Sequence, residues 1–275
     1  MFNKYNSKNR KKIKGWLSEI DNRILEVILE LQVNNEIVGS VAEIGLHHGK
    51  SFIPLCLSLQ EKEKGYGIDL FEDQAKNIDQ SGRGSTLYVN NNLADFGISP
   101  ERYVLDSRSS ELVEPSDIVD SVGKIRFFSI DGGHWSEIVM NDLNLAQQVM
   151  CHGGVIALDD YLRPEWPEVA VGFHRWYFEN NKKFSVFAIG FNKVYLCSPD
   201  FLEFYRHALL TDNFLGNFLR KTYDLDGVGI PIYYTLFLPE WNPKVRAYGY
   251  IQLYHPHVFN YFKKFKNRTK PRTKF

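Results

Sequence analysis

The stretch Val41-Ala-Glu-Ile-Gly-Leu-His-His-Gly-Lys50 decides how this chain folds. The apolar run over residues 37–44 predicts a buried strand, and the residues after Gly49 predict a helix. A strand that passes through glycines into a helix presents backbone N–H groups at the helix start, where a ligand's polar groups can approach the bare main chain. The spacing of Glu43, Gly45 and Gly49 is Glu-x-Gly-x-x-x-Gly, which differs from the Gly-x-Gly-x-x-Gly of a dinucleotide site.

Strands and helices are predicted in alternation outward from this stretch. The predicted strands cover residues 37–44, 66–70, 103–105, 124–130, 155–158, 184–189 and 193–197. The predicted helices cover residues 16–32, 51–59, 86–96, 136–150, 167–179 and 199–221. Such alternation is typical of an α/β fold, and the Gly190-Phe-Asn192 turn between the last two strands indicates a hairpin. We therefore predict a Rossmann-like, doubly wound, mostly parallel seven-stranded sheet with an antiparallel terminal hairpin strand.

Acidic residues follow the predicted strands where each one ends. They are Glu43, Asp69, Asp106, Asp131, Asp159 and Asp160. Because ligands of parallel α/β sheets bind beyond these ends, we expect a site at this edge. Asp69 lies about 20 residues beyond the glycines, where an acid can accept hydrogen bonds from both hydroxyls of a ribose. A helix cap or an ordinary loop acid is the alternative for Asp69.

Three carboxylates, Asp131, Asp159 and Asp160, converge if the fourth and fifth strands are neighbours. Carboxylates held close together repel one another unless a cation lies between them, and their hard oxygens suit Mg²⁺, or Mn²⁺ as a substitute. His134 lies three residues beyond Asp131, and its imidazole can accept a proton near neutral pH. The alternatives are that the acidic pair caps the loop after its strand and that His134 bonds to nearby backbone at a helix start.

Together these residues resemble the motifs of class I S-adenosyl-L-methionine (SAM) methyltransferases. The resemblance is to the metal-dependent sugar O-methyltransferases, the group also called macrocin-O-methyltransferase-like or cephalosporin-hydroxylase-like, and it covers residues 36–198. It implies a metal site formed by Asp131, Asp159 and Asp160, with His134 as the catalytic base. Other sugar methyltransferases have an aspartate base where Gly133 stands here, which leaves His134 as the candidate.

The same resemblance implies which residues contact the cofactor. They are Glu43, Gly45, Gly49, Asp69, Asp106, Ser107 and Ser109. The last three follow the third strand, where the adenine edge would lie, although capping of the next helix is an equal alternative. His47 and His48 depart from the family pattern and have no assigned role, and residues 199–275 match no part of the family.

Thirty-three basic residues balance 33 acidic residues, so the chain has no net field that attracts nucleic acid. Basic residues gather at both ends, most strongly over residues 263–274, where solvated disorder is expected. The cysteines Cys56, Cys151 and Cys197 stand in apolar contexts without a Cys-x-x-Cys pair, which indicates reduced thiols and a cytoplasmic location. No apolar run approaches the roughly 18 residues of a membrane span, and no signal core follows the basic start, so we expect neither a span nor secretion.

We divide the chain into three parts. They are a basic segment with an amphipathic helix over residues 1–35, the SAM-binding domain over residues 36–198, and a helical and aromatic extension over residues 199–275. Aromatic residues crowd residues 231–262 and can stack on sugars, but covering the core or a subunit interface is the simpler interpretation. We expect a homo-oligomer.

The predicted function is that of a SAM-dependent, Mg²⁺-assisted O-methyltransferase acting on a hydroxyl of a vicinal diol, on a sugar or a glycosylated small molecule. One alternative is a metal-dependent enzyme of another class, such as a hydroxylase, although an Fe(II) site normally uses two histidines and one carboxylate. Another is a SAM-fold module without catalysis that binds a glycan or a partner. A nicotinamide dehydrogenase is disfavoured by the glycine spacing and the closing hairpin.

Overall fold

The computed structural model describes residues 2–5, 7–78, 80–180, 183–225 and 227–235, and the single residues 247, 251, 255 and 258. Met1–Tyr234 form one compact unit, and Thr235–Phe275 form a second. The sheet and the predicted site lie in the first unit. No helix among the described residues is long and apolar enough to cross a bilayer.

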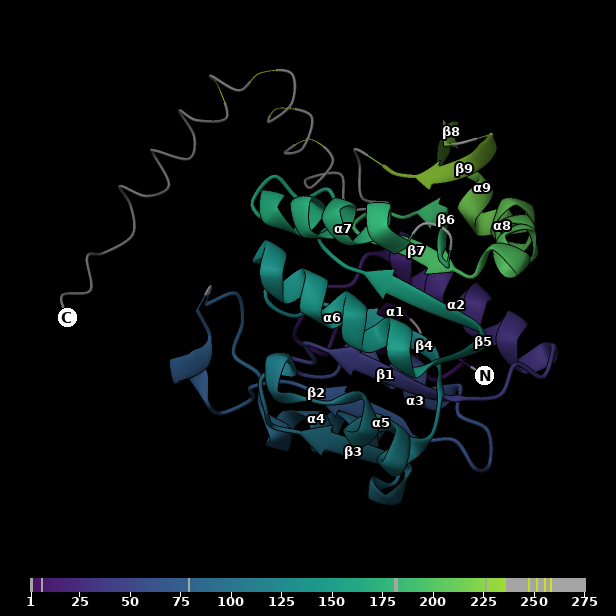
Figure 1. The fold of residues 1–275 in the computed structure, drawn as a ribbon. Coiled ribbons are helices and arrows are strands. Elements are labelled where there is room, and N and C mark those ends of the chain that lie inside the picture. Colours follow the sequence, from purple (N-terminus) through teal and green to yellow (C-terminus); the bar gives the residue numbers. More distant parts are fainter. Residues whose placement is uncertain are drawn as a thin grey trace. The chain divides into compact units, whose positions relative to one another are not determined.

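Within the described residues a nine-stranded sheet has the order β3-β2-β1-β4-β5-β7-β6-β9-β8 (Figure 1). The strands are β1 (Ser40–Ile44), β2 (Gly65–Ile68), β3 (Tyr103–Asp106), β4 (Ile125–Ile130), β5 (Met150–Leu158), β6 (Ser185–Ile189), β7 (Val194–Cys197), β8 (Leu219–Leu225) and β9 (Val228–Tyr233). β1 to β5 run parallel, β7 is antiparallel to β5, and β6 and β7 form the predicted hairpin. The carboxyl ends of β1 to β5 therefore meet at one edge.

Helices cover both faces of the sheet. They are α1 (Ser7–Arg10), α2 (Glu19–Asn34), α3 (Phe52–Leu57), α4 (Thr86–Asp95), α5 (Pro115–Val122), α6 (Ser136–Val149), α7 (Pro167–Asn180), α8 (Leu202–Thr211) and α9 (Asn213–Gly216). α5, α6 and α7 lie on one face, and α2, α3, α4 and α8 pack on the other (Figure 1). Short 3₁₀ turns η1 (Gln74–Lys76), η2 (Pro100–Arg102), η3 (Ser110–Leu112) and η4 (Pro199–Phe201) fall in the connections.

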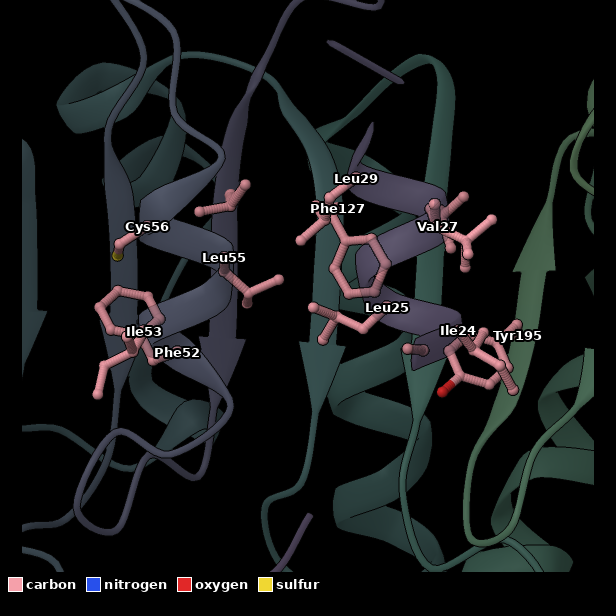
Figure 2. Close-up of a cluster of buried hydrophobic side chains, with 14 of the residues drawn as sticks. Ile24, Leu25, Val27, Leu29, Phe52, Ile53, Leu55, Cys56, Phe127 and Tyr195 are labelled. Carbon is pink, nitrogen blue, oxygen red and sulfur yellow. The ribbon is translucent and has the colours of Figure 1, made fainter. Parts of the chain in front are cut away.

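The face under α2 shows how the sequence builds the core. α2 begins after the N-cap Ser18, whose hydroxyl accepts a hydrogen bond from the Asp21 N–H at 2.8 Å. Its apolar residues recur every three or four positions and lie over the strands, beside those of α3 (Figure 2). Every residue of β1 and β4 is buried, as expected for central strands that are covered on both faces.

The predicted fold class and hairpin are present, but the sheet has more strands than the predicted seven. The predicted helix over residues 199–221 is wrong beyond Gly216, because β8 begins at Leu219 and pairs with β9. The sequence Asp226-Gly227 separates these two strands, and Asp-Gly is a strong signal for a two-residue hairpin loop. The additional hairpin extends the sheet at its antiparallel edge, away from β1 and β4.

The predicted domain limits at residues 35 and 198 stay a prediction. In the compact unit, the segments on both sides of these limits pack together, because α8 contacts both α2 and β6. The aromatic stretch over residues 231–262 and the basic end over residues 263–274 lie largely outside the described residues. The three cysteines form no disulfide.

Candidate active site

The glycine loop after β1 lies against the end of β4. Gly45 has φ +83°, and a Cβ there would lie 1.7 Å from the backbone oxygen of Asp131, so only glycine fits. The Gly45 N–H donates to the Ile68 carbonyl at 2.8 Å. The Asp131 N–H donates to the Ile44 carbonyl, also at 2.8 Å. The loop therefore joins the ends of β1, β2 and β4. Gly49 has φ +79° and also needs the freedom of glycine.

Asp69 follows β2 and is held by the same loop. Its Oδ2 accepts a hydrogen bond from the His47 N–H at 2.7 Å, and its Oδ1 accepts one from the Phe71 N–H at 2.6 Å. Burial raises the pKa of the Asp69 carboxyl above its usual value, and these backbone hydrogen bonds oppose the rise. A Cβ on Gly84 would lie 2.5 Å from Asp69 Oδ1, so the chain at Gly84 lies directly over this carboxylate.

A cavity of about 460 Å³ opens at this edge of the sheet. Pockets for small molecules and cofactors span roughly 300–1,000 Å³, so its size suits such a ligand. Seven predicted site residues line it: Gly45, Asp69, Ser109, Asp131, His134, Asp159 and Asp160. Its wall also carries exposed aromatic side chains, since Trp16 is 73% exposed and Trp135 is 37% exposed. The structure thus brings residues that follow five strands to one cavity.

Four predicted cofactor residues do not line this cavity, namely Glu43, Gly49, Asp106 and Ser107. Asp106 has protein partners instead. Its Oδ2 accepts a hydrogen bond from the Tyr66 hydroxyl at 2.7 Å and pairs with the Arg108 guanidinium at 2.6 Å. Burial raises the pKa of Asp106, but these hydrogen bonds lower it more, to below its usual value. Arg108, rather than Asp106, lies on the cavity wall.

Glu43 lies inside β1, below the loop. It is 0% exposed, and neither of its carboxyl oxygens makes a hydrogen bond within the described part of the chain. Burial raises the pKa of Glu43 to about 7, although the nearby Ser51 hydroxyl and the Lys193 charge lower it. Glu43 thus lies in the strand that precedes the glycine loop and not on the cavity wall.

An acidic cluster with one histidine follows β4 and β5. One ligand atom each of Asp131, His134 and Asp160 lies within 4.8 Å of the others, a spacing that allows them to share one metal ion. Burial, and then the charge of Asp159, raises the pKa of Asp131 well above its usual value. A cation between these groups would relieve the repulsion, so the donors present fit a divalent ion such as Mg²⁺ or Mn²⁺.

His134 precedes α6 and contacts both Asp160 and Trp166. Its Nε2 lies 2.9 Å from Asp160 Oδ2, and its ring stacks on Trp166 with ring centroids 4.2 Å apart. Burial raises the pKa of Asp160, but hydrogen bonds from His134 and Asn192 lower it below its usual value. Asp160 also has φ +56°, a left-handed conformation that is uncommon outside glycine. The imidazole therefore lies beside an ionised carboxylate held in a defined orientation.

Asp159 makes different contacts from the other two acids. Its Oδ2 accepts a hydrogen bond from Lys193 Nζ at 2.5 Å, and its Oδ1 accepts one from Asn192 Nδ2 at 2.6 Å. Asp159 is thus absent from the group of ligand atoms that the geometry brings together, although the sequence predicts it as a ligand. Lys193 and Asn192 are absent from the prediction. The sequence signal that could have indicated a buried ion pair is the position of Lys193 at the start of an otherwise apolar strand.

His47 and His48, which have no role in the sequence-based prediction, stack on each other with ring centroids 4.2 Å apart. His48 also stacks on Tyr88, with ring centroids 4.6 Å apart, and the ring centroids of Trp16 and His47 are 5.5 Å apart. The His47 backbone has φ +51° and supplies the N–H that holds Asp69. The two histidines therefore belong to a row of rings along the glycine loop.

Part of the chain is similar to a known protein family. Residues 42–161 match the family model described as a methyltransferase domain. No curated protein matches the chain. The solved structure of the O-methyltransferase NovP aligns with a TM-score of 0.56 at 16% identity, over 65% of this chain and 80% of NovP. The O-methyltransferase from Bacillus cereus in complex with SAH aligns with a TM-score of 0.51 at 14% identity, over 70% of this chain and 90% of that one.

The matched segment agrees with the motifs. It runs from β1 to the loop after β5 and contains the glycine loop, Asp69 and the acidic cluster. The predicted fold class is confirmed, as is the resemblance to class I SAM-dependent O-methyltransferases. Residues 42–161 match a methyltransferase domain, in a chain whose fold is that of the O-methyltransferase structures with which it aligns.

Proposed function

We propose that the protein transfers the methyl group of SAM to a hydroxyl of a vicinal diol, with the assistance of a bound divalent ion. The observation that carries this proposal is that the acidic cluster and His134 open into the same cavity as the glycine loop and Asp69. A methyl donor and a diol can therefore meet in one space. NovP and the Bacillus cereus protein are both named O-methyltransferases, which supports oxygen as the accepting atom.

Gly45, Asp69 and Ser109 are the residues on the cavity wall that would hold SAM. Gly45 allows a ligand to approach the loop backbone, because no side chain stands there. Each Asp69 oxygen already accepts one backbone hydrogen bond and keeps capacity for a second, from a ribose hydroxyl. Glu43 and Gly49 do not line the cavity and would influence SAM only indirectly.

Asp131 and Asp160 are the proposed metal ligands, while Asp159, the third predicted ligand, is paired with Lys193. A divalent ion there would supply charge that lowers the pKa of one diol hydroxyl and would orient both oxygens. His134 would accept the proton of that hydroxyl, because the neighbouring Asp160 carboxylate stabilises the imidazolium. Trp166 covers one face of the imidazole and limits its contact with water. Positioning and charge neutralisation would supply most of the rate.

A sugar, free or attached to a small molecule, is the proposed acceptor. Trp16, Trp135 and Trp166 line the cavity, and indole faces stack on the apolar faces of sugar rings. Neighbouring hydroxyls of a pyranose supply the two oxygens of a vicinal diol. Mg²⁺ as the ion, a cytoplasmic location and a homo-oligomeric state stay predictions within this proposal.

Turnover of His134→Ala and Asp160→Ala, measured with methyl-labelled SAM and a panel of sugars and catechols, tests the assignment. His134→Ala should lower kcat by about 100-fold or more, the contribution of a general base, while SAM binding is unchanged. Asp160→Ala should lose the stimulation by Mg²⁺. Unchanged turnover in His134→Ala would remove His134 as the base. A wild-type enzyme that is fully active in EDTA would remove the metal from the mechanism.

A further inference from the structure

Lys193 is a buried cation beneath the acidic cluster. It lies at the β6–β7 turn, is 2% exposed, and its Nζ is 2.5 Å from Asp159 Oδ2. Asp159 is itself only 8% exposed. A buried ion pair is held strongly, because removal of one partner leaves the other charged group without compensation in a poorly solvated place. The charge of Asp159 is therefore already neutralised by a buried ammonium, which disfavours a second cation at this carboxylate.

Asn192 fixes the second oxygen of Asp159 and orients its neighbour. Its Nδ2 donates to Asp159 Oδ1 and to Asp160 Oδ1, both at 2.6 Å. The Asn192 backbone N–H donates to Asp21 Oδ2 at 3.0 Å, and the Tyr195 hydroxyl donates to Asp21 Oδ1 at 3.1 Å. The β6–β7 turn is thus anchored on α2, and each oxygen of Asp159 accepts a hydrogen bond from a side chain of this turn, one of them from a charged ammonium.

We propose that Lys193 and Asn192 are positioning residues that keep Asp159 as a counter-ion, so that the metal is bound by Asp131 and Asp160 without Asp159. This inference rests on the metal site of the proposed function. The family resemblance implies three carboxylate ligands, whereas this chain uses one of the three to neutralise its own lysine. The site then offers two carboxylates to the ion, and Asn192 directs one of them.

Calorimetric titration of the full chain with Mg²⁺ and with Mn²⁺, without SAM or acceptor, tests this inference. The decisive variant is the double change Asp159→Asn with Lys193→Met, which removes both charges of the pair together. We expect its metal affinity to stay within about threefold of wild type, whereas Asp160→Asn should lower the affinity by about 30-fold or more. Thermal unfolding followed by circular dichroism confirms that each variant is folded. A double variant that loses as much affinity as Asp160→Asn would overturn the inference, because Asp159 would then be a ligand.

The single change Lys193→Met gives an independent readout. It frees the Asp159 carboxylate and removes a positive charge near the ion, so it should raise metal affinity by about tenfold or more, which a purely structural lysine would not do. If this variant does not fold, the double variant decides. A wild type that binds no metal, beside a Lys193→Met variant that does, would overturn both the metal part of the proposed function and this inference, because the ion would then need Asp159. Absence of binding in both would overturn both.

Discussion

Glu43→Gln should remove a pH-dependent loss of stability that Glu43 imposes on the wild type. Glu43 is fully buried in β1 without a hydrogen bond in the described part of the chain, and burial raises its pKa from 4.5 to about 7. Between these two values the unfolded chain carries an ionised Glu43, whereas the folded chain keeps it protonated. Unfolding then releases a proton, so rising pH favours the unfolded state. The loss of unfolding free energy begins near pH 4.5, the pKa in the unfolded chain, and is complete above about pH 7, the pKa in the folded chain.

The size of the effect follows from the two pKa values. Each unit of difference corresponds to about 1.4 kcal/mol, so the full cost of ionising Glu43 in the folded state is about 3 kcal/mol. From pH 5 to pH 8 the wild type should lose about 2.5 kcal/mol of unfolding free energy that Glu43→Gln does not lose. Asp21 and Asp142, whose pKa values burial raises to about 6 and about 7, titrate in the same interval. They are present in both proteins and cancel in the comparison.

Urea unfolding at pH 5, 6, 7 and 8, followed by circular dichroism, measures this difference directly. The unfolding free energies of wild type and Glu43→Gln should diverge steadily as the pH rises, with the variant the more stable at pH 8. Two parallel curves would refute the reasoning, because they would show that Glu43 is ionised and stabilised inside the folded protein at low pH.

Two further changes test the packing that supports the site. Gly45→Ala should lower stability by about 3 kcal/mol or more, because it combines a positive φ with a Cβ 1.7 Å from a backbone oxygen. Gly216→Ala is the control and should change stability little, because the space around Gly216 is open. Equal melting temperatures of the two variants would contradict the geometry of the loop. Arg126→Met removes a 0% exposed guanidinium that lies 3.1 Å from Glu63, and should cost about 3–5 kcal/mol. Arg175→Met, at a surface ion pair, is its control in the same urea assay, and a similar small effect for both would show that the buried pair is not needed.

Much of the fold is predictable because local signals and the global fold agree. The glycines at 45 and 49 stand where the turn needs positive φ, and the helix predicted over residues 86–96 corresponds to α4 at Thr86–Asp95. The β8–β9 hairpin is not predicted, because the sequence around it is interpreted as part of a helical and aromatic extension. The local signal that indicates the hairpin is the Asp-Gly pair at residues 226 and 227. Strong periodicity over long segments is easier to interpret than short strands at a sheet edge.

The site is predictable only where its residues follow parallel strands. Asp131 and Asp160 can be placed from the chain order alone, because the carboxyl ends of β4 and β5 lie at one edge. The position of Lys193 cannot be predicted from the chain order, because its contact with Asp159 depends on the antiparallel register of β5 and β7, in which Leu158 pairs with Val194. A shift of one residue would turn the ammonium to the opposite face of the sheet, and the sequence does not specify that register.

Calorimetric titration with SAM and with S-adenosylhomocysteine, in the presence and absence of Mg²⁺, tests the central claim most directly. We predict micromolar binding of at least one of them, a free energy of about −8 kcal/mol, and a loss of about tenfold or more in affinity for Asp69→Ala. Binding of this strength would establish that the cavity at the ends of β1, β2 and β4 is a SAM site. No binding of either compound under any of these conditions would contradict the account and leave the acidic cluster as a site for a different ligand.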